Sequence, residues 1–218
     1  MVHAQRGQKA ARKLLGAFCG TLVSDRWGGY NFFCGVRQIC WSHLKRDFKA
    51  LSEAKGTIGK IGLELYGLAK KILKMRARVR DRTLQWQTFQ KRMTPLMKRV
   101  EELLEEGANV KCTLSGKCRR IIKHREHLWT FVHDQSVDPT NNIAERIVRQ
   151  GVLWRKSSFG TQSERGARYV ERILTVCATC RLQGRSVIEY LREACHCHLS
   201  GIAVPSLIKP EGDLAKTA

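Results

Sequence analysis

The longest uninterrupted pattern in the sequence is helical, and it limits the folds that the chain can adopt. Between about Thr57 and Val132 strand signals disappear, and apolar residues recur at steps of three and four. This spacing places them on one face of a helix. The apolar positions are Ile58, Ile61, Leu65, Leu68 and Ile72, then Leu84, Phe89, Met93, Leu96, Val100 and Leu103. We therefore predict a helical hairpin or small bundle over residues 57–132.

Two short strands are predicted before the helical segment. Residues 21–24 are a short strand candidate between Gly20 and Asp25. In residues 36–40, Val36, Gln38 and Cys40 would share one face of a strand and Ile39 would lie on the other. A short helix is expected within residues 1–18, and another near Trp41, with Ser42 as its candidate N-cap. The fold class is therefore α/β but predominantly helical.

Residues 138–149, DPTNNIAERIVR, predict the start of another helix. With Asn142 as the N-cap, Glu145 falls at the third helical position, beside exposed backbone N–H groups and the positive end of the helix dipole. Two interpretations of Glu145 are open. It completes a capping box and pairs with Arg149 four residues later, or it is a functional carboxylate.

Residues 151–161 are expected to form a short extended piece and a loop. A long helix is then predicted from Ser163 to about Gln183, with Cys177 and Cys180 on its apolar face. Ser186 begins a capping box for a last helix, in which Val187, Leu191 and Cys195 are expected to point inward. Beyond Ser200 we expect a loosely ordered tail.

Asp25 stands directly after the first predicted strand. A carboxylate just beyond the C-terminal end of a buried strand lies where α/β folds place their chemistry. The alternative is an ordinary turn residue before the glycine pair at 28–29, and the local sequence alone favours that alternative.

The charge of the chain indicates a polyanionic partner. The chain contains forty Lys and Arg residues and nineteen Asp and Glu residues, which gives a formal charge of +21. The basic residues are spread from Arg6 to Arg192. Such a distribution favours nucleic acid bound through its phosphates. Residues 151–161 mix basic, aromatic and hydroxyl side chains, which suits a surface that holds a nucleic-acid strand. The basic run 70–82 fits either a solvated helix face or phosphate contacts.

The nine cysteines do not indicate a disulfide framework, because their number is odd and no apolar signal core opens the chain. Cys177 and Cys180 have the spacing of metal ligands, and Cys-His-Cys-His at 195–198 looks like a second half-site. Their place on an apolar helical face nevertheless favours core packing for the first pair. No apolar run is long enough to span a membrane, and we expect a cytoplasmic protein.

Four blocks follow one another along the chain: VSDRWGGY at 23–30, CWSHLKRDF at 40–48, DPTNNIAERIVR at 138–149 and WRKSSFGTQSERGAR at 154–168. Together they resemble the C-terminal part of the catalytic domain of insertion-sequence-66 family transposases, over roughly residues 5–200. Members of that family are DDE enzymes on a ribonuclease-H-like fold that a helical insertion interrupts. By this resemblance, Asp25 corresponds to the second catalytic aspartate and Glu145 to the catalytic glutamate.

The resemblance implies a site for two metal ions. DNA phosphoryl transfer uses two divalent ions about 3.5–4 Å apart, and Mg²⁺ or Mn²⁺ is held by carboxylates and water. Asp25 and Glu145 would then be both catalytic and metal-binding. The neighbouring basic residues would bind DNA phosphates; they are Lys45, Arg46, Arg146, Arg149, Arg155, Lys156, Arg165 and Arg168.

The same resemblance divides the chain into four segments. Residues 1–56 and 133–200 would form the N- and C-terminal parts of the catalytic core, 57–132 the helical insertion and 201–218 a tail. No Asp or Glu precedes Asp25, so the family's first catalytic aspartate and first strands have no counterpart, and Asp47, Asp134 and Asp138 do not lie in the matching position.

We therefore expect a partial ribonuclease-H-like fold and a transposase fragment that is impaired or inactive alone. Its expected partners are the ends of transposon DNA, the missing N-terminal segment and a second copy of the chain. Two other hypotheses remain open at this point. One is a non-catalytic nucleic-acid-binding protein, and the other is a helical module that zinc stabilises through the Cys and His pairs.

Overall fold

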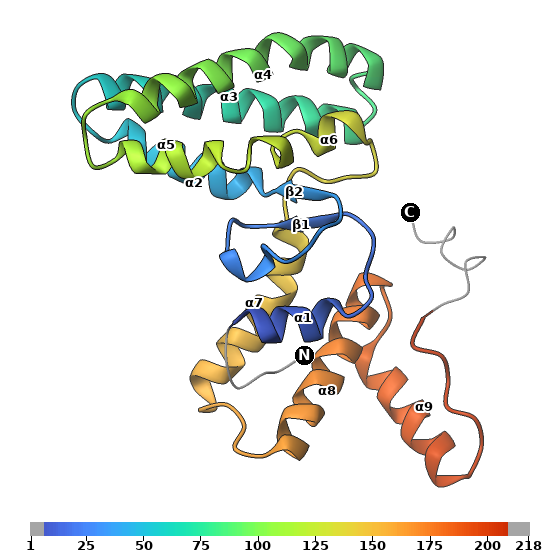
Figure 1. The fold of residues 1–218 in the computed structure, drawn as a ribbon. Coiled ribbons are helices and arrows are strands. Elements are labelled where there is room, and N and C mark those ends of the chain that lie inside the picture. Colours follow the sequence, from blue (N-terminus) through green and yellow to red (C-terminus); the bar gives the residue numbers. More distant parts are fainter. Residues whose placement is uncertain (1–6, 209–218) are drawn as a thin grey trace. The chain divides into compact units, whose positions relative to one another are not determined.

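The computed structural model describes residues 7–208 of the 218-residue chain (Figure 1). The described chain divides into two compact units, Gly7–Ile143 and residues 144–208, which are called here the first and the second unit. None of its described helices is long and apolar enough to cross a membrane. The helix expected within residues 1–18 is α1 (Gln8–Leu15), and residues 1–6 lie outside the described part.

The first unit contains a pair of parallel strands, β1 (Leu22–Ser24) and β2 (Arg37–Ile39). Leu22 lies opposite Arg37 and Ser24 opposite Ile39, and the connection between the strands includes a 3₁₀ turn, η1 (Gly28–Tyr30). Both predicted strands are thus confirmed, each slightly shorter than expected. All three residues of β2 are buried, so this strand lies inside the unit.

Side chains fasten β2 to the segment around residue 130. Gln38 is fully buried; its Nε2 donates to the carbonyl of Leu128 at 3.0 Å and its Oε1 accepts from the backbone N–H of Phe131 at 2.9 Å. The hydroxyl of Thr130 donates to the carbonyl of Arg37 at 2.5 Å. These bonds satisfy polar groups of β2 and of the segment after α5, which would otherwise be buried without partners.

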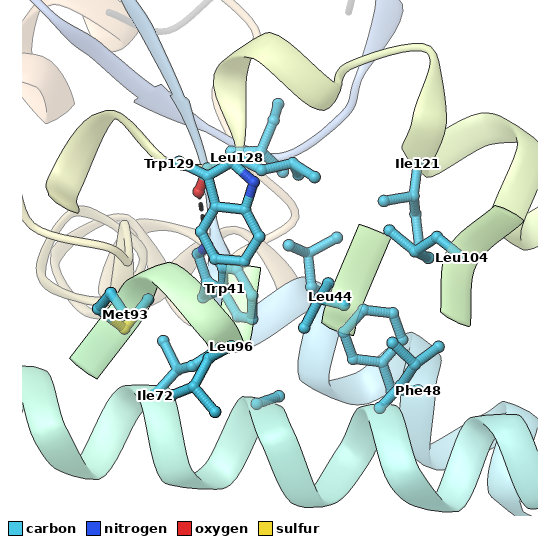
Figure 2. Packing of buried hydrophobic residues seen from close by; sticks show 14 of the residues in the cluster. Trp41, Leu44, Phe48, Ile72, Met93, Leu96, Leu104, Ile121, Leu128 and Trp129 are labelled. Atoms are coloured by element: carbon cyan, nitrogen blue, oxygen red, sulfur yellow. Dashed lines mark hydrogen bonds between the residues drawn. The ribbon is translucent and has the colours of Figure 1, made fainter. Parts of the chain in front are cut away.

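Helices make up the rest of the first unit. They are α2 (Trp41–Ser52), α3 (Thr57–Arg80), α4 (Trp86–Asn109), α5 (Ser115–Ile122) and α6 (Thr130–His133), with a 3₁₀ turn, η2 (Arg125–His127), before α6. The predicted hairpin is confirmed as α3 and α4, which Figure 1 shows side by side. Figure 2 shows how side chains from these helices interleave in one core. The largest fully buried members include Trp41, Leu44, Phe48, Leu65, Ile72, Phe89, Met93, Leu103, Leu104 and Phe131.

The start of α2 differs from the prediction. Cys40, not Ser42, is the residue before the helix, and no side chain within the described part caps it. Instead the backbone N–H of Trp41 donates to the carbonyl of Pro139 at 2.8 Å. A carbonyl from a distant segment therefore satisfies one of the N–H groups that a helix start leaves without partners, and a serine cap is not needed.

The same distant segment is held by α3. Nη2 of Arg76 donates to the carbonyl of Gln135 at 2.6 Å and to that of Val137 at 3.2 Å. Asp138 then accepts from the backbone N–H of Thr140 at 2.8 Å, which closes the predicted turn. These contacts lead the chain into α7 (Asn142–Ser157), whose first two residues belong to the first unit.

The second unit consists of the rest of α7, α8 (Glu164–Leu182) and α9 (Val187–Leu199). The extended piece expected after residue 150 is wrong, because α7 continues through Ser157. Gly151 does not break the helix, and a Cβ atom at this position would lie 3.0 Å from Leu174 Cδ1, so the glycine allows α8 to approach. The predicted Ser186 cap is confirmed, because Ser186 Oγ accepts from Glu189 N at 3.3 Å. Ser163, where the long helix was predicted to begin, is also a cap, since its Oγ accepts from Gly166 N at 3.0 Å.

The C-terminal cysteines and tail were predicted in part. Cys180 is buried and Cys177 is half-buried, which agrees with core packing for this pair. Cys197 is also buried, but Cys195 is exposed and does not point inward. Within residues 7–208 no three His, Cys, Asp or Glu side chains lie together as metal ligands would. The expectation of a loosely ordered tail stays a prediction for residues 201–208, which form no helix or strand and are mostly exposed. Arg185 and Tyr190 donate hydrogen bonds to carbonyl oxygens of this segment, and residues 209–218 lie outside the described part.

Candidate active site

Asp25 lies immediately after β1 and lines a pocket of about 620 Å³ in the first unit. Three segments line this pocket: the loop after β1, one face of α2, and α5 with the residue pair that follows it. The lining residues are Asp25, Arg26, Trp27, His43, Arg46, Asp47, Arg120, Lys123 and His124. We call it the Asp25 pocket.

Local hydrogen bonds fix the backbone and the carboxylate of Asp25. Its Oδ1 accepts from the backbone N–H of Trp27 at 3.0 Å, and the hydroxyl of Ser24 donates to its carbonyl at 2.9 Å. Asp25 is therefore a turn residue, as its local sequence suggested. It also borders the pocket, so the turn role does not exclude a functional one.

Asp47 on α2 is held by two cations. Its Oδ2 forms an ion pair with Arg26, and its Oδ1 lies 3.9 Å from Lys117 Nζ. These contacts join the loop after β1, α2 and the first turn of α5. Asp47 therefore has a clear structural role in shaping the pocket.

A buried guanidinium lies near the pocket. Arg37 on β2 is only 4% exposed, and its Nε and Nη2 have no hydrogen-bond partner among the residues that the structure describes. Burial lowers the pKa of Arg37, whereas the charge of Asp25 raises it. Because burying a cation is costly without a counter-charge, Arg37 and Asp25 stabilise one another.

Two histidines stand at the same end of the unit. Burial is the main cause that lowers the pKa of both His124 and His127, and the positive charge of Arg37 lowers each further. His124 lines the pocket. Both imidazoles are therefore biased towards their neutral forms.

We expect this bias to make the protein less stable in mild acid. The folded-state pKa of each histidine lies below the value of about 6.5 that it has when unfolded. Below that value the unfolded chain binds more protons than the folded one, so the free energy of unfolding falls as the pH is lowered from about 7 to 5.5. Urea titrations of wild type and of a His124→Gln/His127→Gln variant measure this, and the variant should show a flatter dependence. Equal pH dependence in the two proteins would contradict it.

The structure places the predicted site residues in both units. On α2, Arg46 lines the Asp25 pocket, whereas Lys45 is half-buried outside its lining. Glu145 is exposed in the first turn of α7. The remaining predicted DNA contacts are also exposed in the second unit: Arg146, Arg149, Arg155 and Lys156 on α7, and Arg165 and Arg168 on α8. The convergence of Asp25 with Glu145 stays a prediction, because the two residues belong to different units.

An unusual aromatic residue connects α7 to α8. Phe159 is 93% exposed and has a φ of 56°, and Gly160 follows with a φ of 81°. A bulky residue rarely adopts this conformation, and exposure of a whole aromatic ring to water is unfavourable. Such a residue beside Arg155 and Lys156 is well suited to stacking on a nucleic-acid base.

The chain matches a known protein family over most of its length. The family model described as Transposase IS66 family matches residues 1–169, which is most of the chain and includes Asp25, Glu145 and the whole Asp25 pocket. The chain belongs to the IS66 transposase family. A transposase-related function follows from this membership.

Two curated relatives are similar over most of this IS66 chain. An uncharacterized protein of Sinorhizobium fredii, y4qI, is 25% identical over 210 residues, which are 86% of the chain and 38% of the relative. A second one from the same organism, y4jD, is 21% identical over 211 residues, or 90% of the chain and 41% of the relative. The chain thus spans about two fifths of the length of these relatives. No solved structure matches it significantly.

The sequence analysis did not predict all the residues in and near the Asp25 pocket. It assigned no site role to Arg37, Arg120, Lys123 or His124. The spacing of the last three residues, three and then one, puts them on neighbouring positions of a helical surface. That signal indicates a common face but not what the face borders.

Proposed function

We propose that this chain carries part of the DDE active site of a transposase and acts on DNA with Mg²⁺ or Mn²⁺. The observation that carries the proposal is the position of Asp25, at the C-terminal end of a parallel strand and open to a basic pocket, in a chain of the IS66 family. A ribonuclease-H-like core, of which β1 and β2 are a part, and a cytoplasmic location belong to the same proposal.

The proposed chemistry follows from the two carboxylates. Asp25 and Glu145 would hold two divalent ions, and these ions would activate the attacking oxygen and stabilise the leaving one. A hydrogen bond from Trp27 holds the Asp25 carboxylate in place, and Glu145 is exposed at the start of a helix. Neither carboxylate is sealed in the core of its own unit, so metal ions and DNA have access to both.

The proposed substrate follows from charge and exposure. The chain carries a formal charge of +21, and the basic residues of α7 and α8 are solvent-exposed. Phosphate contacts from such residues would hold DNA, and Phe159 would stack on an unpaired base near the transposon end. Strand cleavage and transfer are proposed for the whole transposase, since this chain spans about two fifths of its relatives. Impaired activity of the chain alone stays a prediction.

A metal-binding experiment tests the shared site. Mn²⁺ binding to the full chain is measured by electron paramagnetic resonance for wild type, Asp25→Asn, Glu145→Gln and the double variant. We expect each single change to weaken binding by roughly tenfold or more, because even residues that only orient a ligand typically contribute about tenfold. If both carboxylates bind the same ions, the two effects are coupled and the double variant falls short of their sum.

The control is Asp81→Asn, which removes an exposed carboxylate at the end of α3. This change should leave Mn²⁺ binding unaltered. Strictly additive effects of the two main substitutions would mean separate sites and would contradict the proposal. So would the absence of Mn²⁺ binding by a wild-type chain that circular dichroism shows to be folded.

A second candidate function is nucleic-acid binding without catalysis. The excess of cations over carboxylates in the Asp25 pocket favours it. The lining contains only two carboxylates but four cations, which are Arg26, Arg46, Arg120 and Lys123. Under this alternative, Asp25→Asn and Glu145→Gln would leave Mn²⁺ binding unchanged and DNA affinity equal or higher. The metal experiment therefore separates the two functions.

A further inference from the structure

Two guanidinium groups have unused hydrogen-bonding capacity: that of Arg26, which lines the Asp25 pocket, and that of Arg37, which lies near the pocket but outside its lining. Nη1 of Arg26 is buried and has no hydrogen-bond partner within residues 7–208, although Nη2 of the same side chain contacts Asp47. Arg37 has two further nitrogens in this state. Buried donors without partners are rare in folded proteins and call for an explanation. An anion with several acceptor oxygens would supply one.

The pocket is lined to receive such an anion. Its cations outnumber its carboxylates by four to two, and one of those carboxylates, Asp47, is already held by Arg26 and Lys117. Arginine and lysine are the usual ligands of phosphate oxygens. A volume of about 620 Å³ is within the range of sites that hold molecules of nucleotide size.

Helix α5 supplies one side of the pocket and is firmly positioned. Its Cys118 is fully buried, and a Cβ atom on Gly107 of α4 would lie 2.7 Å from the Cys118 sulfur, so the two helices are in close contact. Lys117 reaches Asp47 on α2. Arg120 is thus part of a helix that is fixed on two sides, and Lys123 directly follows that helix, although both side chains remain exposed.

From these observations we infer that the Asp25 pocket binds a phosphodiester group of a DNA strand, and that Arg120 of α5 and Lys123, which directly follows α5, are phosphate-binding residues of this site. The inference rests on the proposed function, because the strand is the DNA on which Asp25 acts. It assigns a role to the helical segment 57–132, which contributes ligands to the substrate site in addition to separating the two parts of the catalytic core. It also offers an acceptor to Nη1 of Arg26, a pocket-lining residue whose Nη1 has no hydrogen-bond partner within residues 7–208.

The test compares two matched variants of the full chain. Arg120→Ala/Lys123→Ala removes one arginine and one lysine from the pocket, and Lys91→Ala/Arg92→Ala removes the same pair from the exposed surface of α4 outside it. Binding of a fluorescein-labelled oligothymidylate is followed by fluorescence anisotropy over a range of salt concentrations. Circular dichroism checks that both variants are folded.

We expect the pocket variant to bind roughly tenfold more weakly, and the α4 variant to differ from wild type by less than about threefold. The slope of log K against log salt should fall by about 0.7 for each lost phosphate contact, hence by about 1.4 for two. Equal losses in the two variants would mean that only general charge matters, and would overturn the inference while leaving the proposed function intact.

A second probe distinguishes the inference from the function on which it rests. Binding of inorganic pyrophosphate to wild type and to the pocket variant is measured by nuclear magnetic resonance of the backbone amides. Shifts around Asp25 and α5 that the pocket variant loses would support the phosphate site. Such shifts without binding of the oligonucleotide would contradict both the assignment of the site to a DNA strand and the proposed function. A wild-type chain that binds neither probe would overturn the inference.

Discussion

Replacing Trp41 by alanine is expected to destabilise the first unit by about 3–5 kcal/mol, the usual cost of removing a large aromatic residue from a core. The indole is fully buried and its ring centre lies 4.9 Å from that of Trp129 and 6.0 Å from that of Phe131. Its Nε1 donates to the carbonyl of Leu128 at 2.8 Å, a bond that is drawn in Figure 2. One side chain therefore joins α2 to the segment that carries η2 and α6.

Urea-induced unfolding followed by circular dichroism measures the effect, with Trp41→Phe as the matched variant. Phenylalanine keeps most of the apolar contact but cannot donate to Leu128, whose carbonyl still accepts from Gln38 at 3.0 Å. We expect Trp41→Phe to cost less than alanine, in the range of about 1–2 kcal/mol for a lost buried hydrogen bond and a small void. A Trp41→Ala protein with wild-type stability would show that the core described around this residue is wrong.

Local patterns in the sequence predicted the elements of the fold well. The apolar spacing between Ile58 and Leu103 corresponds to the buried faces of α3 and α4, because a long amphipathic helix repeats its signal over many turns. Ser186 caps its helix as expected, since a cap depends only on residues three positions apart. The sequence blocks also led to the family that the comparisons show.

Contacts between distant segments could not be predicted in the same way. The N–H of Trp41 is bound by Pro139, almost a hundred residues later, and no feature near Ser42 reveals this. The sequence predicts that a helix ends before Gly151. The alternative, a glycine inside a helix that allows close packing, depends on the position of Leu174, which only the structure shows. The contribution of α5 to the Asp25 pocket depends on how α4 and α2 hold that helix. Each of these facts requires the three-dimensional arrangement of elements, which local periodicity does not contain.

Replacing Gly62 by alanine is expected to destabilise the first unit by about 1–3 kcal/mol, although alanine is the better helix former. Gly62 lies on the face of α3 that packs against the end of α2, and a Cβ atom there would lie 2.5 Å from the carbonyl carbon of Leu51. Because that atom belongs to the backbone, a side-chain rotation cannot relieve the clash. The two helices must separate, and the core residues of α2, among them Phe48, lose contacts with α3.

Gly67 in the same helix is the control for this argument. It is exposed, and nothing lies within 4 Å of the position that its Cβ would occupy. Alanine at Gly67 should therefore stabilise the protein by up to about 1 kcal/mol through helix propensity alone. Alanine at Gly62 and alanine at Gly67, two positions of the same helix, should thus change the free energy of unfolding in opposite directions. Thermal and urea unfolding can measure both changes. If both variants were stabilised, α2 and α3 would not be in the close contact described, and the α2 face of the Asp25 pocket would lack its support.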